Sequence, residues 1–104
     1  MKAAKIIMKC LKEEDVNLVF GYPGGAVLPL FEAIRESNIE HVLVRNEQSL
    51  VHYASGYYRT TGKVGVCIAT SGPGATNTIT GIATAYLDSI PVIVITGQVN
   101  TDFG

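Results

Sequence analysis

An apolar strand meets a helix in the stretch Val42-Leu43-Val44-Arg45-Asn46-Glu47-Gln48-Ser49. Residues 42–44 resemble the end of a buried strand, and the helix is expected to begin near Asn46. Glu47 then falls in the first helical turn, where free N–H groups and the helix dipole favour acidic residues. It would also lie at the carboxyl end of a parallel strand, where open α/β sheets bind ligands. The stretch alone leaves open whether Glu47 serves the helix or a ligand.

Apolar strands alternate with amphipathic helices along the rest of the chain. The strands are expected at 18–20, 41–44, 64–69 and 91–96, and the helices at 2–14, 26–36, 46–60 and from the turn 70–74 to about 87. The helix faces expected to be buried are Ala4, Ile7, Met8 and Leu11; Val51, Ala54 and Tyr58; and Ile79, Ile82, Ala83 and Tyr86. This alternation predicts the α/β class, with an open parallel sheet and helices on both faces.

Composition restricts the class of protein. With 104 residues, 47% hydrophobic and 16% charged, the chain suits one globular domain. Its formal charge of −1 attracts neither nucleic acid nor an anionic membrane, and no apolar run is long enough to cross a bilayer. The N-terminus lacks the apolar core of a signal peptide. We therefore expect a cytoplasmic protein with no nucleic-acid or membrane partner.

The two cysteines, Cys10 and Cys67, lack the spacing of a metal site or a redox motif. Cys67 falls in an expected strand and Cys10 in the first amphipathic helix, so both are expected to be buried free thiols. Neither His41 nor His52 belongs to a cluster of metal-binding residue types. No metal site is expected.

The end of the sequence also carries an expectation. The chain stops soon after the fourth strand, at Thr101-Asp102-Phe103-Gly104, without a helix to cover that strand. A four-stranded sheet of this kind would leave apolar surface and an open edge. We therefore expect this chain to be the leading piece of a longer one.

Two glycine-rich stretches are near misses for phosphate-binding motifs. Residues 72–77 follow a strand and open a helix, but Asn77 replaces the third glycine of a dinucleotide fingerprint and Pro73 lacks an N–H. Residues 56–63 have the wrong glycine spacing for a phosphate loop and lead into a strand instead of out of one. The patterns disfavour dinucleotide binding and exclude a phosphate loop.

Position, instead, is what the loops have in common. The segments 21–25, 46–48, 70–74 and 97–98 all follow expected strands, so they should gather at one edge of the sheet. Glycines there let a flat ligand approach the backbone. Glu47 is the single carboxylate in these four segments.

Several motifs together resemble the acetohydroxyacid synthases (acetolactate synthases), in the large, catalytic subunit. They are Gly21-Tyr22-Pro23-Gly24-Gly25-Ala26, Glu47-Gln48, Gly56-Tyr57, Gly62-Lys63-Val64-Gly65-Val66, residues 70–77, residues 88–92 and Gly97-Gln98-Val99. The resemblance covers nearly the whole chain in the right order. It implies that residues 1–104 form about the first two thirds of an N-terminal pyrimidine-binding domain for thiamine diphosphate.

The resemblance also implies roles for individual residues. Glu47 would be catalytic, hydrogen-bonding the ring nitrogen N1′ of the cofactor's aminopyrimidine so that the exocyclic nitrogen can take the proton from thiazolium C2. Gln48 would support Glu47. The pyrimidine pocket would be lined by Tyr22, Pro23, Pro73 and Asn77, and the loop near the reacting carbons would be formed by Gly24, Gly25 and Ala26.

For the whole enzyme, the resemblance implies decarboxylation of pyruvate and transfer of the two-carbon unit to a second 2-oxo acid, in branched-chain amino-acid synthesis. Mg²⁺ and FAD would be held only by the middle and diphosphate-binding domains, which this chain lacks. A homodimer or higher oligomer is expected, with a regulatory small subunit as a further partner. Because half of the site is missing, the isolated 104 residues are expected to be inactive.

The sequence departs from the family at Asn46, where the family usually has His, and at Ser49 and Leu50, where it has small residues. Two alternatives to this function also stay open. One is the same domain of another thiamine-diphosphate decarboxylase or carboligase. The other is a non-catalytic piece that only folds or associates.

Overall fold

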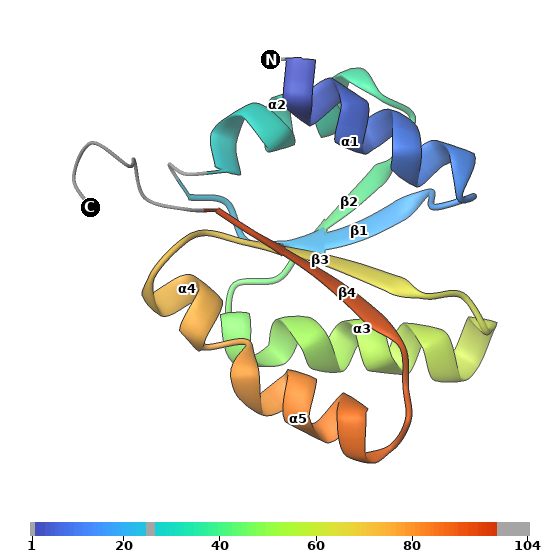
Figure 1. The fold of residues 1–104 in the computed structure, drawn as a ribbon, viewed down its shortest axis with the longest axis vertical. Coiled ribbons are helices and arrows are strands. Elements are labelled where there is room, and N and C mark those ends of the chain that lie inside the picture. Colours follow the sequence, from blue (N-terminus) through green and yellow to red (C-terminus); the bar gives the residue numbers. More distant parts are fainter. Residues whose placement is uncertain (1, 25–26, 98–104) are drawn as a thin grey trace.

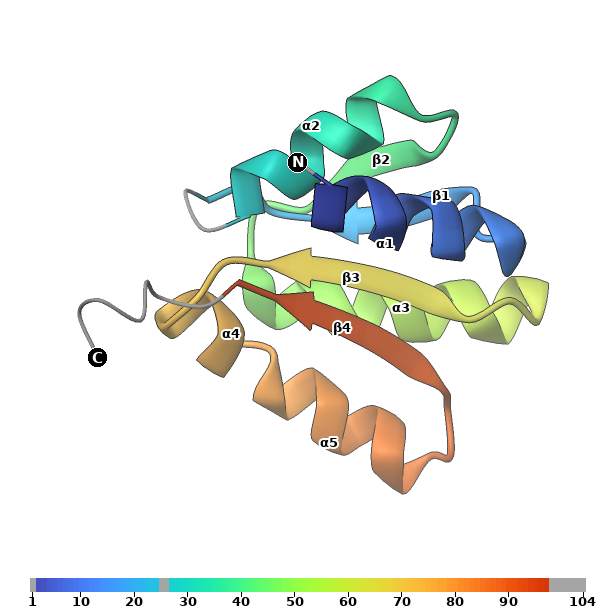
Figure 2. The same cartoon turned by 45° about the horizontal axis from the view of Figure 1, so that its top comes forward.

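Four parallel strands form the centre of the computed structural model, which describes residues 2–24 and 27–97. The strands are β1 (Leu18–Gly21), β2 (Glu40–Leu43), β3 (Gly65–Ala69) and β4 (Val92–Thr96), in the order β2-β1-β3-β4. Helices α1 (Lys2–Glu13) and α2 (Leu28–Glu36) cover one face of the sheet, and α3 (Glu47–Thr61), α4 (Pro73–Thr76) and α5 (Ile79–Leu87) lie on the other (Figures 1 and 2). The predicted fold class is confirmed.

Strand register brings the carboxyl ends of the strands to one edge. Gly21 of β1 is level with both Leu43 of β2 and Ile68 of β3, and Ala69 of β3 is level with Thr96 of β4. Figure 2 shows that α4 and the first turn of α3 lie on the side toward which β3 and β4 point. The loops after β1, β2 and β3 therefore meet at this edge, as the sequence predicts.

Each face of the sheet buries its own apolar cluster. Every residue of β3 is buried, and its side chains alternate between the two clusters: Val66 and Ile68 pack toward α1 and α2, while Cys67 and Ala69 pack toward α3. Such a strand reads as a continuous apolar run because neither face meets water. The α1–α2 side is completed by Ala4, Met8, Leu11, Val19, Leu30 and Ile34, and the α3 side by Phe20, Leu50, Val51 and Ala54.

The predicted buried face of the last helix is wrong. Ile79 is 59% exposed and Tyr86 82% exposed, whereas Gly81 and Ala85 are the buried residues of α5. An ideal Cβ on Gly81 would lie 2.6 Å from the Val51 Cβ, so α5 approaches α3 through its smallest residue. The apolar periodicity predicted that the most hydrophobic face of the helix is buried. The close approach of α5 to α3 instead buries the face that carries its small residues.

Two further expectations need correction. Cys10 is exposed, because the buried stripe of α1 runs through Ala4, Met8 and Leu11; Cys67 is buried, as predicted. The single helix expected after residue 74 is divided into α4 and α5 around Asn77 and Thr78.

No helix among residues 2–24 and 27–97 is long and apolar enough to cross a membrane. In the same residues, no three His, Cys, Asp or Glu side chains come close enough together to hold a metal ion.

Candidate active site

Helix α3 begins at Glu47 because Asn46 caps it. The Asn46 backbone is extended (φ −137°, ψ 116°), and its Oδ1 accepts a hydrogen bond from the Gln48 N–H at 2.8 Å. This satisfies one of the backbone donors that a helix N-terminus leaves unpaired. Asn46 therefore has a structural role in this chain. The cap places Glu47 in the first turn, directly after β2.

The side chain of Glu47 extends toward the start of α4. Its Oε2 lies 3.4 Å from the position that a Cβ on Gly74 would occupy. Glu47 is half-buried, and it takes part in neither ion pair found in the described part of the chain, Lys5–Glu36 and Arg59–Asp88. The carboxylate therefore remains available to a ligand at the carboxyl edge of the sheet.

Thr70, the first residue after β3, packs between two glycines at this edge. A Cβ on Gly24 would lie 2.5 Å from the Thr70 Cβ and 2.6 Å from its Oγ1, and a Cβ on Gly74 would lie 2.7 Å from its Cγ2. Real Cβ atoms essentially never approach this closely, so both positions require glycine while Thr70 stays where it is. The loops after β1 and β3 are thus joined through one side chain.

The other predicted cofactor-binding residues differ in burial. Tyr22 is half-buried, and its N–H donates to the Ile68 carbonyl at 3.2 Å. Pro23, Gln48, Pro73 and Asn77 are exposed, and Gly25 and Ala26 lie outside the described residues. The structure brings Glu47 and Gly24 to the same edge, with Thr70 and Gly74 between them, and leaves the roles of the exposed residues as predictions.

Thr70 is the site residue that the sequence did not single out. It occupies the first position after an apolar strand, directly before Ser71-Gly72-Pro73-Gly74. That position carried a signal, because the first residue after a strand is where α/β sheets place ligand-contacting groups. Its neighbours across the loops, Gly24 and Gly74, could be identified only from coordinates.

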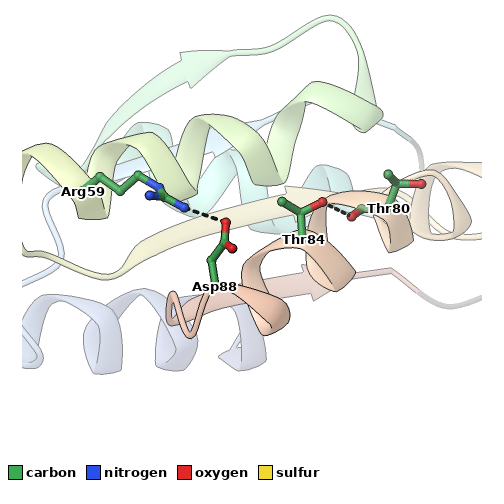
Figure 3. A network of polar contacts seen from close by, with 4 residues as sticks. All are labelled: Arg59, Thr80, Thr84 and Asp88. Carbon is green, nitrogen blue, oxygen red and sulfur yellow. Dashed lines mark hydrogen bonds and ion pairs between the residues drawn. The ribbon is translucent and has the colours of Figure 1, made fainter.

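The helix that carries Glu47 is also tied to α5 at its far end. Arg59 Nη2 lies 2.7 Å from Asp88 Oδ2, just after α5, and within α5 the Thr84 hydroxyl donates to the Thr80 carbonyl at 3.0 Å (Figure 3). The Arg59 and Asp88 side chains are 55% and 49% exposed, so solvent screens the pair and its contribution to stability is small. The close contact of Gly81 with Val51 is the stronger constraint on α3.

The domain has a parallel α/β sheet, and at the carboxyl edge of that sheet a carboxylate in the first turn of a capped helix lies among glycine-rich loops. This arrangement is typical of a class of ligand-binding domain. The chain matches, over residues 1–103, the family described as thiamine pyrophosphate enzyme, N-terminal TPP binding domain, and it belongs to that family. Thiamine pyrophosphate and thiamine diphosphate are the same compound.

The chain is also similar to acetolactate synthase large subunits. It is 56% identical over 103 residues to the isozyme 2 large subunit of Escherichia coli, and the aligned residues make up 99% of this chain and 19% of that protein. It is 57% identical over 100 residues to the large subunit of Haemophilus influenzae (95% and 18%) and 56% identical over 97 residues to that of Lactococcus lactis (92% and 17%). The chain therefore spans less than a fifth of the length of these relatives.

Proposed function

We propose that these residues are the N-terminal part of the pyrimidine-binding domain of an acetolactate synthase. The complete polypeptide would decarboxylate pyruvate and join the two-carbon unit to a second 2-oxo acid. The names of the similar proteins support the reaction, and the family supports the cofactor. The observation that carries the proposal is the position of Glu47, whose Oε2 lies beside Gly74 at the ligand-binding edge.

The residues at this edge suit the pyrimidine half of thiamine diphosphate. Gly24 and Gly74 let the loops after β1 and β3 pack closely around Thr70, and this packing brings the start of α4 beside the Glu47 carboxylate. Glu47 is half-buried and free of an ion pair, which leaves its carboxyl group able to hydrogen-bond a ring nitrogen. These features give the chain one acid group at the carboxyl edge of the sheet, beside closely packed glycine loops.

In the proposed mechanism, Glu47 holds and returns a proton at N1′ of the aminopyrimidine. A carboxyl group at hydrogen-bond distance from the atom it serves contributes roughly 10²–10⁴-fold to a proton-transfer step. When bound, the cofactor supplies the carbanion chemistry, and the protein supplies orientation and control of protons. Tyr22, Pro23, Gly25, Gln48, Pro73 and Asn77 are proposed to complete the pyrimidine pocket.

The proposal also covers what lies beyond these 104 residues. Mg²⁺ and FAD would be bound by other domains of the complete polypeptide, and pyruvate and a 2-oxo acid would react where those domains meet this one. We propose a cytoplasmic enzyme that forms a homodimer or higher oligomer, with a regulatory small subunit as a further partner.

The test is Glu47→Gln in the full-length polypeptide, assayed for acetolactate from pyruvate with thiamine diphosphate, Mg²⁺ and FAD. We expect a loss of at least about 100-fold in kcat with the fold retained, because glutamine cannot exchange the proton. The matched control is Glu40→Gln, which changes an exposed carboxylate at the opposite end of β2 and should leave activity unchanged. Near-normal activity of Glu47→Gln would refute the proposal.

A further inference from the structure

We infer that Thr70 is a positioning residue: its side chain sets the separation between Gly24 and Gly74, and thereby the place of Glu47 relative to a bound ring. The inference rests on the proposed function. It concerns a residue that the predicted set of cofactor-binding residues does not include.

Thr70 meets the two glycines with different sets of atoms. Toward Gly24 all three side-chain atoms are close: Cβ, Oγ1 and Cγ2 lie 2.5, 2.6 and 2.9 Å from the ideal Cβ position. Toward Gly74 the nearest atom is the methyl carbon Cγ2 at 2.7 Å, while the Thr70 Cβ is at 3.7 Å, an ordinary contact distance. Gly24 therefore meets the whole side chain, whereas Gly74 closely meets only its methyl group.

The methyl group of Thr70 and the Glu47 carboxylate both face Gly74. Glu47 Oε2 and Thr70 Cγ2 both approach the same side of Gly74, at 3.4 and 2.7 Å from the ideal Cβ position. The two groups are thus no farther apart than the sum of these distances. Any shift of Gly74 relative to Thr70 moves the start of α4 relative to Glu47.

Neither glycine has a positive φ, since the positive-φ glycines of the described residues are Gly62 and Gly72. An alanine at position 24 or 74 is therefore costly because of contact with Thr70, and not because of backbone conformation. The Thr70 hydroxyl has no hydrogen-bond partner among the described residues. The shape of the side chain is therefore what excludes a larger residue from positions 24 and 74.

The difference between the two contacts predicts a selective rescue. Thr70→Ser removes Cγ2 and keeps Cβ and the hydroxyl. It should relieve the collision caused by Gly74→Ala, because the remaining Cβ is far enough away. It should not relieve the collision caused by Gly24→Ala, because Cβ and Oγ1 are the atoms in the way. Thr70→Val keeps both branches and serves as the shape-conserving control.

The experiment uses the full-length polypeptide with thiamine diphosphate and Mg²⁺. Two quantities are measured: the affinity for the cofactor by calorimetry, and the rate of exchange of its thiazolium C2 proton in D₂O at saturation. The exchange rate depends on how the aminopyrimidine ring is placed relative to Glu47. When it is expressed per bound cofactor, it does not change if part of the protein is unfolded. A misplacement of about 1 Å at a reacting group can cost on the order of 100-fold.

We expect Gly74→Ala to slow exchange at least about tenfold, and Gly74→Ala/Thr70→Ser to recover to within about threefold of wild type. Gly24→Ala should stay slow with or without Thr70→Ser, and Thr70→Val alone should exchange like wild type. If Gly74→Ala does not fold, the exchange rate of the folded double variant is the deciding measurement, and it should lie within about threefold of wild type.

Absence of rescue at Gly74, equal rescue at Gly24, or slow exchange in Thr70→Val would overturn the inference. A Glu47→Gln control separates this failure from failure of the proposed function. If Glu47→Gln exchanges normally, the proposed function is wrong; if it is slow and the rescue pattern is absent, only the role of Thr70 is wrong.

Discussion

Gly81 on α5 lies so close to Val51 on α3 that a Cβ on the glycine would be 2.6 Å from the valine Cβ. Val51 is completely buried, so it has no free space into which to move. This contact fixes the distance between α5 and α3, the helix that carries Glu47.

Gly81→Ala is therefore expected to destabilise the chain. Overpacking of a filled core costs about 1–3 kcal/mol, which exceeds the gain of up to about 1 kcal/mol from replacing a helical glycine. The matched control is Gly56→Ala in α3, where an added Cβ meets nothing within 4 Å and the helix propensity alone should stabilise. Urea denaturation of both variants measures the difference, and Val51→Ala should partly rescue Gly81→Ala. Equal effects of the two glycine substitutions would contradict the packing described.

Asn46→Ala should lower the free energy of unfolding by about 0.5–2 kcal/mol, because α3 loses its side-chain cap. Asn46→Asp keeps an acceptor at the same place and should cost much less. Chemical denaturation compares the two variants. A loss in Asn46→Asp as large as that in Asn46→Ala would show that the cap is not the source of the stability.

The two cysteines should differ sharply toward a thiol reagent. Cys10 is exposed, whereas Cys67 is buried and its thiol donates to the Leu50 carbonyl at 3.4 Å. Treatment with N-ethylmaleimide at neutral pH, followed by peptide mass spectrometry, should find Cys10 modified and Cys67 intact until denaturant is added. Modification of both at similar rates in the native protein would disprove this account of the core.

Cys67 should also make stability depend on alkaline pH. Burial raises the pKa of its thiol from the ordinary 9.0 to about 12. Below pH 9 the Cys67 thiol keeps its proton in both the folded and the unfolded state, so its ionisation does not lower the free energy of unfolding. Between pH 9 and about 12 only the unfolded state releases it, and the free energy of unfolding falls by up to about 1.4 kcal/mol per pH unit. Cys67→Ala should show a shallower fall in denaturation measured over this range; an equal slope would exclude Cys67 as the source.

The Arg59–Asp88 pair should contribute little. A double-mutant cycle with Arg59→Ala and Asp88→Ala is expected to give a coupling energy below about 1 kcal/mol that decreases with added salt, because both side chains are half exposed. The Lys5–Glu36 pair, 4.0 Å apart and more exposed, offers a comparison in which the coupling should be close to zero. A large, salt-independent coupling at Arg59 would contradict this estimate.

The alternation of apolar runs and amphipathic helices determined the α/β class and the common edge of the strand ends, because local periodicity dictates which elements can form. Asn46 followed by an acidic residue likewise marked the start of α3 from sequence alone, since capping is a local interaction. Family motifs added the expected role of Glu47.

Tertiary packing decided what periodicity could not. The buried face of α5 passes through Gly81 and Ala85 because α3 is close, and Cys10 falls outside the narrow buried stripe of α1. The place of Thr70 between Gly24 and Gly74 depends on neighbouring strands that are distant in the sequence. Such contacts join residues through space, and a linear pattern carries no measure of the distance between them.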